Sequence, residues 1–399
     1  MGKGIAITGM GIISAIGVNV RENYESLITS KTGISTISKV DTIHKDAILV
    51  GEVPTTNAAF EKQLGLDENS WSRTSLLAVV AAKEAVAQAG IYDINDCRTG
   101  LISGTTVGGM DKSEQYFYDY FESDTNWKYV NSLHAGDSTK KIAKALGLEE
   151  SFATTISTAC SSAANAIMLG ARMIKAGELD RVIVGGADAL SKFTINGFKT
   201  LMILSDTYNT PFDEHRKGLN LGEAAAFLVL ESDEIVRREK KEVLGYVKGY
   251  ANANDAHHQT ASSDNGDGAV LAMEKALKVA GLQPKAVDYV NAHGTATPNN
   301  DLSEGRAMLR VFHGKVPKFS STKSFTGHTL AVAGAVEAIY SVLALQNNVI
   351  YPNLNFNTPM QEFDLVPETE LQEKELNIIL SNSFGFGGNC TTLIFSKKA

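Results

Sequence analysis

Cys160 stands where a strand gives way to a helix, a position that can activate a thiol. Residues 152–157 alternate and carry β-forming side chains, so they predict a strand. Residues 161–175 are rich in alanine and larger aliphatic side chains, so they predict a largely buried helix. The free N–H groups and positive dipole end of that helix favour a thiolate at Cys160. The alternative is a small buried hydrophobic residue, as most free cysteines are, and this stretch alone favours neither interpretation.

Three further stretches, all in the second half of the chain, carry groups that could work with Cys160. They are residues 291–297 with His293, residues 321–328 with Lys323 and His328, and the glycine-rich loop 382–388. Each has a plain explanation alone, because loop histidines are usually structural and glycines often only turn the chain. Together they bring a thiolate, two imidazoles, a lysine and a flexible loop to strand ends, where α/β proteins hold their sites. The combination indicates nucleophilic catalysis by Cys160.

Short apolar strands alternate with amphipathic helices along the whole chain, which predicts an α/β fold with helices on mixed or parallel sheets. The predicted strands are 99–104, 181–186, 244–251, 287–292, 376–380 and 392–395, and the predicted helices are 76–90, 268–281 and 330–345. Residues 5–9 predict a first strand that enters a tight turn at Gly9. The elements predict two similar halves, 1–240 and 241–399, that meet at the charged segment 233–242, although no residue period proves duplication.

Composition and charge narrow the classes of function. The 399 residues are 43% hydrophobic and 21% charged, which is typical of a well-packed globular protein. The net charge of −8 gives no broad attraction to nucleic acid or to an anionic membrane, and we expect no apolar run long enough to span a bilayer. The odd set of widely spaced cysteines, Cys97, Cys160 and Cys390, argues against disulfides and a zinc cluster. We therefore expect a reducing, cytoplasmic location, no metal, and no nucleic-acid or membrane partner.

Residues 111–128 carry a dense group of aromatic side chains among acidic ones. Aromatics at this density usually bury themselves against a neighbouring element, so a local mini-core is the first interpretation. A dimer contact, or one wall of a hydrophobic substrate tunnel, is the second interpretation.

Four blocks of the sequence, in the right order, resemble the signature motifs of the β-ketoacyl-ACP synthases, most closely the elongating, Cys-His-His type. They are 158–162 around Cys160, His293-Gly294-Thr295 with Thr297, Pro298 and Asp301, Lys323 with Thr326-Gly327-His328, and 385–388. Further matches run from residue 5 to residue 384, so the similarity covers essentially the whole chain. The resemblance implies a thiolase fold, a five-layered α/β/α/β/α arrangement of two pseudo-repeated halves. It also implies a homodimer, with a heterodimer as the alternative.

The resemblance further implies a decarboxylative Claisen condensation. Cys160 takes an acyl chain from acyl carrier protein (ACP), malonyl-ACP loses CO2, and the resulting carbanion attacks the acyl-cysteine to give a 3-oxoacyl-ACP. His293 and His328 stabilise the enolate if each presents an N–H, and the backbone N–H groups of Cys160 and Phe386 form the oxyanion hole. No cofactor is implied, because the 4′-phosphopantetheine arrives on the carrier protein.

Other residues receive supporting roles from the same resemblance. Lys323 tunes and orients the site through its charge, with Glu304 as its expected partner, and Phe386 gates the acyl tunnel. The supporting residues are Glu304, Thr295, Thr297, Phe384 and Gly387. The two threonines either hold their loop or touch the pantetheine arm.

The chain departs from the family pattern where the departure bears on partner and substrate. Asn389-Cys390 follows Gly388 where the family usually has Thr-Asn, so we expect different hydrogen bonding in the glycine loop. Residues 66–70 are acidic where several elongating synthases carry a basic cluster for the carrier protein. Residues 108–136 are unusually aromatic. These departures favour a related polyketide or aryl-polyene pathway, which we rank second. Fatty-acid elongation remains the first expectation for the pathway.

Two other functions remain as alternatives to this acyltransferase. A thiolase acting on CoA esters shares the fold but uses a second catalytic cysteine, and Cys390 lies on the wrong side of the glycine run for that pattern. A non-catalytic subunit that sets chain length within a heterodimer typically lacks the cysteine. This chain keeps Cys160, His293 and His328.

Overall fold

Ten strands pair into one continuous mixed sheet in the computed structural model, which describes residues 4–399. Their order across the sheet is β11 (Lys318–Ser320), β10 (Tyr289–Asn291), β14 (Ile378–Gly385), β15 (Asn389–Ser396), β9 (Gly245–Asn254), β1 (Ile5–Ile13), β8 (Ala224–Ser232), β6 (Arg181–Asp188), β4 (Thr99–Gly104) and β5 (Phe152–Ile156). The predicted strands are all present, most of them extended by a few residues.

The two halves of this sheet follow one pairing plan. From the centre outward, β1, β8, β6, β4 and β5 pair antiparallel, antiparallel, parallel and parallel. From the same centre, β9, β15, β14, β10 and β11 repeat that series. The halves join where Ala6 pairs with Tyr246 and Ile7 with Gly245. The pseudo-repeat is therefore confirmed, while the boundary between 1–240 and 241–399 stays a prediction, and residues 1–3 lie outside the described range.

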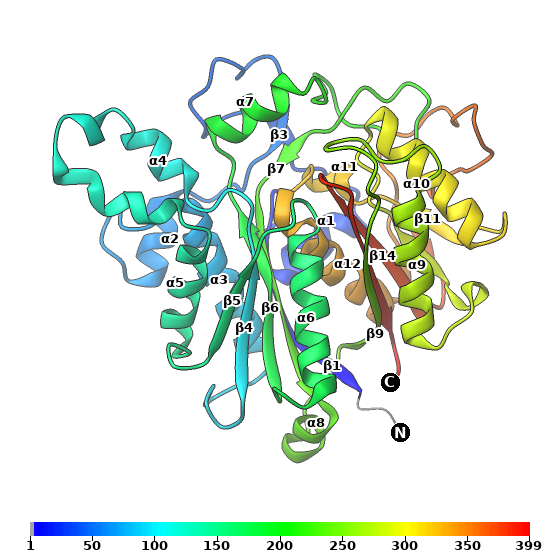
Figure 1. Ribbon diagram of the computed structural model, residues 1–399, viewed down its shortest axis with the longest axis horizontal. Coiled ribbons are helices and arrows are strands. Elements are labelled where there is room, and N and C mark those ends of the chain that lie inside the picture. Colours follow the sequence, from blue (N-terminus) through cyan, green and yellow to red (C-terminus); the bar gives the residue numbers. More distant parts are fainter. Residues whose placement is uncertain (1–3) are drawn as a thin grey trace.

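Helices cover both outer faces of the sheet and fill the space between its halves (Figure 1). The outer helices are α3 (Arg73–Gln88) and α5 (Gly136–Leu146) on the first half, and α9 (Asp267–Ala280) and α10 (Pro298–Val311) on the second. Between the halves, α6 (Ser162–Ala176) packs against α12 (Ala333–Asn347). The layers are α/β/α/β/α, which confirms the predicted thiolase fold.

The facing sides of the central pair of helices have almost no polar surface, which is why the pair lies between the two halves of the sheet. Every residue from Ala333 to Leu345 is buried, and α6 buries most of its first three turns. At their contact a Cβ on Gly334 would lie only 2.7 Å from the Cβ of Ala164. The two helices thus approach closely near their N-terminal ends, where a larger residue than glycine has no room.

Shorter elements connect these layers. The helices are α1 (Val20–Ile28), α2 (Asn57–Leu64), α4 (Met110–Tyr116), α7 (Lys192–Thr200), α8 (Asp233–Glu239) and α11 (Lys323–Thr326). The 3-10 helices are η1 (Asp119–Phe121), η2 (Asp124–Leu133), η3 (Pro284–Ala286) and η4 (Leu330–Val332), and the remaining strands are β2 (Ile34–Thr36), β3 (Leu49–Gly51), β7 (Leu221–Gly222), β12 (Val349–Ile350) and β13 (Gln372–Glu373).

The first strand differs from its prediction. β1 does not turn at Gly9 but continues to Ile13, with an irregularity in its pairing between Ile7 and Gly9. A Cβ on Gly11 would lie 2.0 Å from the carbonyl oxygen of Ala81 on α3. The glycines of this strand therefore mark the close approach of a helix rather than a turn.

The expectation that no apolar run is long enough to span a bilayer was wrong, because one stretch has the necessary length and composition. The stretch Leu330–Asn347, made of η4 and α12, is long and apolar enough. However, 89% of this stretch is buried inside the protein. Its apolar character is explained by its place between the two halves of the sheet, each of which contributes apolar side chains to the same core.

The aromatic segment 111–128 does not form the expected mini-core. Tyr116 stacks on Tyr129, a buried residue just beyond the segment, with ring centroids 4.6 Å apart. The exposed aromatics are Phe117, Tyr118, Phe121 and Trp127. Most of the aromatic surface therefore faces outward, which leaves the dimer-contact interpretation open.

A buried ion pair at the start of α3 provides a test of what stabilises the fold. Arg73 donates through Nε and Nη2 to Glu223 at 2.7–3.0 Å, and both side chains are almost fully buried. Arg73→Leu should lower the free energy of unfolding by about 3–5 kcal/mol, because it leaves a buried carboxylate unpaired. Urea unfolding measures this loss. Arg98→Leu, which breaks an exposed pair with Asp180, is the control and should barely move the midpoint; equal losses would contradict the prediction.

Candidate active site

Cys160 lies in a strained turn between β5 and α6. Ala159 has a φ of 50°, a left-handed conformation that a non-glycine residue rarely adopts. The Ser162 hydroxyl holds the turn closed, because it accepts from the N–H of Thr158 at 2.8 Å and donates to the carbonyl of Ala159 at 2.6 Å. The turn places Cys160 just before the N-terminus of α6, as predicted, and leaves it 6% exposed.

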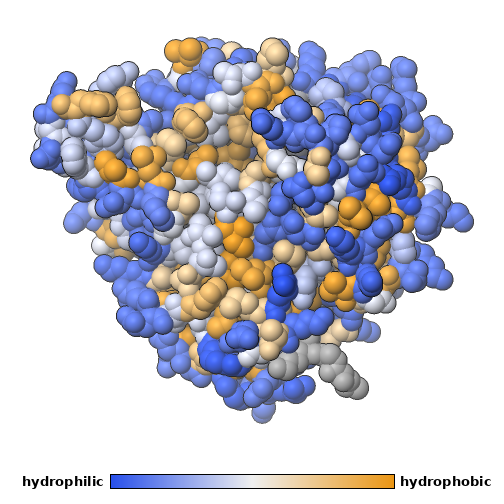
Figure 2. All heavy atoms as spheres, in the orientation of Figure 1, coloured by the Kyte–Doolittle hydropathy of each residue, from blue (hydrophilic) through white to orange (hydrophobic). Residues whose placement is uncertain are grey.

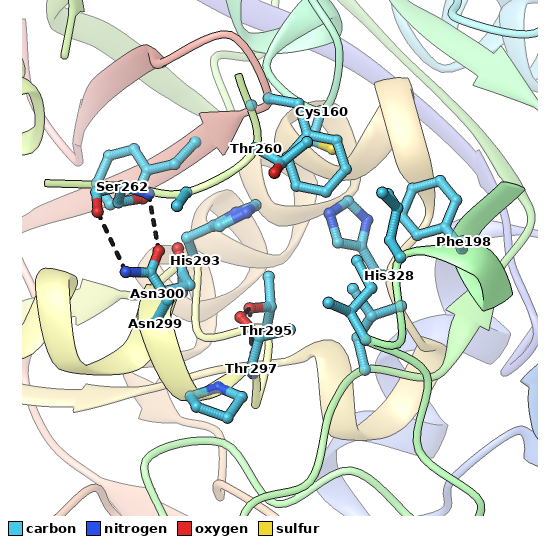
Figure 3. Close-up of a pocket in the computed structure, with 18 of the residues that line it drawn as sticks. Cys160, Phe198, Thr260, Ser262, His293, Thr295, Thr297, Asn299, Asn300 and His328 are labelled. Atoms are coloured by element: carbon cyan, nitrogen blue, oxygen red, sulfur yellow. Dashed lines mark hydrogen bonds between the residues drawn. The ribbon is translucent and has the colours of Figure 1, made fainter. Parts of the chain in front are cut away.

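Cys160 opens into a cavity of about 350 Å³ that also receives both predicted histidines. The rings of His293 and His328 are perpendicular, with centroids 5.4 Å apart. Figure 3 shows the His293 ring edge-on and pointing toward the His328 ring, with Cys160 beside them. The cavity is also lined by Phe198, Thr295, Thr297, Phe384 and Phe386. The structure thus brings together a thiol and two imidazoles from three widely separated parts of the chain.

Backbone contacts decide which nitrogen of His328 carries the proton. The N–H of Leu330 donates to His328 Nδ1 at 3.0 Å, so Nδ1 is the acceptor and the proton lies on Nε2. The backbone N–H of His328 donates to the carbonyl of Asn220 at 2.7 Å, and its carbonyl accepts from the N–H of Gly222 at 2.9 Å. His328 therefore presents an Nε2–H donor from a fixed backbone.

His293 acquires the same tautomer from a different partner. Lys323 Nζ lies 3.2 Å from His293 Nδ1, and an ammonium group can only donate, so the ring proton again lies on Nε2. The backbone of this loop is held by Glu304, which accepts from the N–H groups of His293 and Gly294 at 2.9 and 2.8 Å. Both imidazoles therefore offer an N–H of the kind that can stabilise an oxyanion.

The predicted pairing of Lys323 with Glu304 was wrong. Lys323 forms a short, buried ion pair with Glu337 of α12 instead. Glu304 is occupied by the two backbone N–H groups and by the amide of Asn382, at 3.1 Å. Burial raises the pKa of Glu304 to about 6 and that of Glu337 to about 7, and the Lys323 charge opposes the second shift.

Both histidines are neutral. Burial, and then the charge of Lys323, lower the pKa of His328 to about 3 and that of His293 well below its usual value. A neutral imidazole with its proton on Nε2 cannot accept another proton at that nitrogen. The pair is therefore suited to donating hydrogen bonds and not to general-base catalysis by Nε2.

The expectation of a resting thiolate at Cys160 is not supported by the structure. Burial raises the pKa of this thiol to about 11, while the charge of Lys323 and N–H groups of Phe386 and Cys160 oppose the rise. Desolvation of the buried thiol outweighs the helix dipole at this position. The same N–H groups lie against the sulfur, where a thioester oxygen would develop charge during attack.

The supporting residues lie around this cavity as follows. Phe384 packs its ring 5.6 Å from that of His293. The Thr295 and Thr297 hydroxyls are 2.9 Å apart and line the cavity. Gly387 has a φ of 81°, and its N–H donates to the carbonyl of Gln259 at 2.7 Å. Phe386, the predicted gate, stacks on Phe198 with centroids 5.9 Å apart.

Sequence reasoning missed three residues at the site. Glu337 had a signal, because a lone acid in an otherwise apolar helix requires a buried partner. Asp188 follows the predicted end of its strand and accepts from the Ala331 N–H at 3.0 Å, which ties η4 to β6. Phe198 lies on a helix with ordinary polar composition, and nothing in the sequence marked it.

Comparisons with known proteins agree with this site. The β-ketoacyl synthase N-terminal domain matches residues 3–235, and the C-terminal domain of that family matches residues 244–357. 3-oxoacyl-[acyl-carrier-protein] synthase 2 of Staphylococcus aureus (strain N315) is 35% identical, over 99% of this chain and 98% of the relative. The synthase of the same name from Coxiella burnetii (strain RSA 493 / Nine Mile phase I) is 32% identical, over 98% of each.

Solved structures show the same similarity. The ishigamide ketosynthase/chain length factor has a TM-score of 0.91 and 30% identity, over 99% of each chain. A ketosynthase in complex with its chain length factor from Xenorhabdus doucetiae has a TM-score of 0.86 and 32% identity, over 99% of this chain and 98% of that chain.

The chain belongs to the β-ketoacyl synthase family, which confirms the resemblance seen in its sequence. It is a ketosynthase of the acyltransferase class that catalyses Claisen condensation in fatty-acid or polyketide elongation. Cys390, which a thiolase would need beside Cys160, is buried opposite Phe384 in the β14–β15 pair and does not line the cavity. A chain-length-setting subunit fits only in part, because the thiol and both imidazoles are kept in one cavity.

Alkylation of Cys160 by iodoacetamide tests its protonation. Because its pKa is about 11, the rate should rise about tenfold per pH unit between about pH 6 and about pH 10, without a plateau. Lys323→Met removes a charge that lowers this pKa, so alkylation at a fixed pH should slow by about tenfold. Peptide mass spectrometry follows Cys160 alone. Lys323→Met/Glu337→Gln, which leaves no unpaired acid, should match the single variant, and a plateau near neutral pH would instead indicate a resting thiolate.

Proposed function

We propose that Cys160 is the nucleophile of a decarboxylative condensation between an acyl-ACP and malonyl-ACP, with His293 and His328 as the enolate donors. The observation that carries the proposal is that one cavity holds the thiol, two inward-facing Nε2–H groups and the Phe386 N–H. The proposed reaction needs no cofactor bound to the enzyme, because the phosphopantetheine arm arrives with the carrier protein.

In the first half-reaction, the sulfur of Cys160 attacks the thioester carbonyl of the acyl-ACP. The S–C bond forms, and the carbonyl π electrons move to oxygen, where the N–H groups of Cys160 and Phe386 stabilise them. The carrier thiolate then leaves and takes the proton that the Cys160 thiol gives up. Both neutral histidines keep their Nε2 protons throughout, so they remain ready for the second substrate.

In the second half-reaction, malonyl-ACP loses CO2, and the electrons of the broken C–C bond form an enolate. The Nε2–H groups of His293 and His328 stabilise its oxygen, and the charge of Lys323 fixes the tautomer of His293. The enolate carbon attacks the acyl-cysteine carbonyl, a 3-oxoacyl-ACP forms, and the departing Cys160 thiolate takes a proton from water. The product is two carbons longer than the acyl chain that entered.

We propose that the carrier protein docks at the rim of the cavity formed after α7. Leu201 and Met202 line the cavity and are exposed, Met202 to 88%. Lys199 and Lys217 are exposed, and each lies on one of the two segments that the β-bridge between Leu204 and Leu219 joins. This rim offers a carrier protein the basic and apolar contacts that the acidic residues 66–70 do not. We propose that the enzyme is cytoplasmic and serves fatty-acid elongation or a related pathway.

Mass spectrometry after incubation with an acyl-ACP tests the assignment of Cys160. The Cys160 peptide should gain the mass of the acyl group, and Cys160→Ala should abolish condensation. Cys160→Gln should retain malonyl-ACP decarboxylation, since both histidines remain. If Cys160→Ala were silent, a chain-length-setting subunit would be the better assignment. If Cys160→Gln bound malonyl-ACP but released no CO2, the roles given to the histidines would be wrong.

We propose that two copies of the chain form a homodimer through β5. Among the described strands, β5 is at the outer end of the sheet and pairs only with β4. Its first residues, Phe152 and Ala153, are exposed. Figure 2 shows apolar and neutral residues down the middle of the face that holds α6 and β5, between hydrophilic flanks. Antiparallel pairing of two β5 edges about a two-fold axis would satisfy both edges.

Ala153→Lys tests the dimer, because a two-fold axis brings two like charges to the same contact. Sedimentation velocity should show the dimer weakened at least about tenfold for this variant, while its unfolding midpoint changes little. Val279→Lys, an equally drastic change at an exposed position of α9, is the matched control and should stay dimeric. A fully dimeric Ala153→Lys protein would exclude β5 from the interface.

A further inference from the structure

Asn389 begins β15, and its side-chain oxygen is surrounded by two amide groups and the Ser161 hydroxyl, whose single hydrogen is shared with the Thr158 carbonyl. Its Oδ1 lies 2.7 Å from Ser161 Oγ, 3.0 Å from Asn165 Nδ2 and 2.7 Å from Asn252 Nδ2. Ser161 directly follows the nucleophile, Asn165 is in the first turn of α6, and Asn252 is in β9. The side chain therefore connects the start of β15 to the turn that carries Cys160.

The same residue closes the glycine loop. Asn389 pairs with Gly385 across β14 and β15, so the loop between them contains only residues 386–388. The base of this hairpin already touches the nucleophile turn, since a Cβ on Gly385 would lie 2.9 Å from the Thr158 oxygen and 3.1 Å from the Cys160 nitrogen. One N–H of the proposed oxyanion hole belongs to this loop and the other to the turn. Their separation therefore depends on what holds the hairpin to the turn.

The oxygen of Asn389 reaches the turn because it is one bond farther from the backbone than a hydroxyl would be. A threonine, which the family usually has here, places its Oγ1 on Cβ, so its oxygen lies closer to the β15 backbone than Asn389 Oδ1 does. Ser161 and Asn165 also contact Thr158, through Oγ to its carbonyl at 2.7 Å and Nδ2 to its hydroxyl at 2.9 Å. Asn389 thus completes a polar cluster that encloses the residues on either side of Cys160.

We propose that Asn389 is a positioning residue for acyl transfer: it sets the separation of the Cys160 and Phe386 N–H groups by tying the hairpin to the nucleophile turn. The inference rests on the proposed oxyanion hole. When sulfur attacks a thioester, the new S–C bond pushes an electron pair onto oxygen, and both N–H groups must already point at it. Alkylation by iodoacetamide forms an S–C bond and expels iodide, without any oxyanion. Alkylation therefore reports only the effect of the N–H groups on the thiolate, while acylation adds their effect on the oxyanion.

The experiment compares these two reactions in three variants of the full-length protein. Asn389→Leu removes the acceptor oxygen at similar size, and Asn389→Asp keeps it. Thr391→Val is the matched control, because Thr391 is in the same strand and network, donating to Asn165 Oδ1 at 2.9 Å, but makes no contact with Ser161. Acylation of Cys160 is measured at saturating acyl-ACP, and alkylation by iodoacetamide over a range of pH, both by peptide mass spectrometry.

Asn389→Leu should slow acylation by about tenfold or more. It should slow alkylation by a clearly smaller factor, about twofold to threefold, because the N–H groups that it moves also lower the pKa of Cys160. Asn389→Asp should recover most of the acylation rate, and Thr391→Val should acylate like the native protein. The inference is overturned if Asn389→Leu acylates normally, if Thr391→Val loses as much, or if alkylation falls in parallel. Native protein that is never acylated at Cys160 would overturn the proposed function itself, a different result.

Discussion

The close packing of α6 against α12 is the constraint on which the site depends. Cys160 immediately precedes α6, and His328 precedes η4 and α12. Since Ala164 and Gly334 meet near the N-terminal ends of these helices, the groups before each helix are brought to one place. The third group, His293, follows β10, which pairs with β14 in the second half. The cavity is thus a product of how two similar halves meet, and neither half contains it.

Beside that cavity, burial shifts the pKa values of the catalytic groups, and one buried charge modifies each shift. Lys323 is held by Glu337, lowers the pKa values of both histidines, and opposes the burial that raises the pKa of Cys160. An ammonium in low dielectric acts strongly on groups a few ångströms away. It therefore adds to the burial that keeps the imidazoles neutral, and it makes the thiol more acidic than burial alone would allow. These two effects suit the two half-reactions, the thiolate for acyl transfer and the neutral N–H donors for the enolate.

The local features of the fold could be predicted because their signals are local. The strand, turn and helix around Cys160 follow from the types of neighbouring residues, and the alternation of elements predicted the α/β class. The meeting of Cys160 with His293 and His328 was predicted from their places at strand ends and from resemblance, since no pattern of spacing encodes contacts between such distant residues. Partner choice failed for the same reason: Glu304 and Glu337 are both buried acids near Lys323 in the chain, and only helix orientation selects Glu337. The resting thiolate was wrong because sequence shows a helix N-terminus but not how deeply it is buried.

The shared middle layer also constrains how such an architecture can be assembled. A polypeptide with the first half alone would leave the inward surface of α6 open to water, and one with the second half alone would do the same to α12. Two separate pieces would have to find each other, at a rate and extent set by their concentration. Joining them in one polypeptide makes that encounter intramolecular, so the apolar layer is covered however dilute the enzyme becomes.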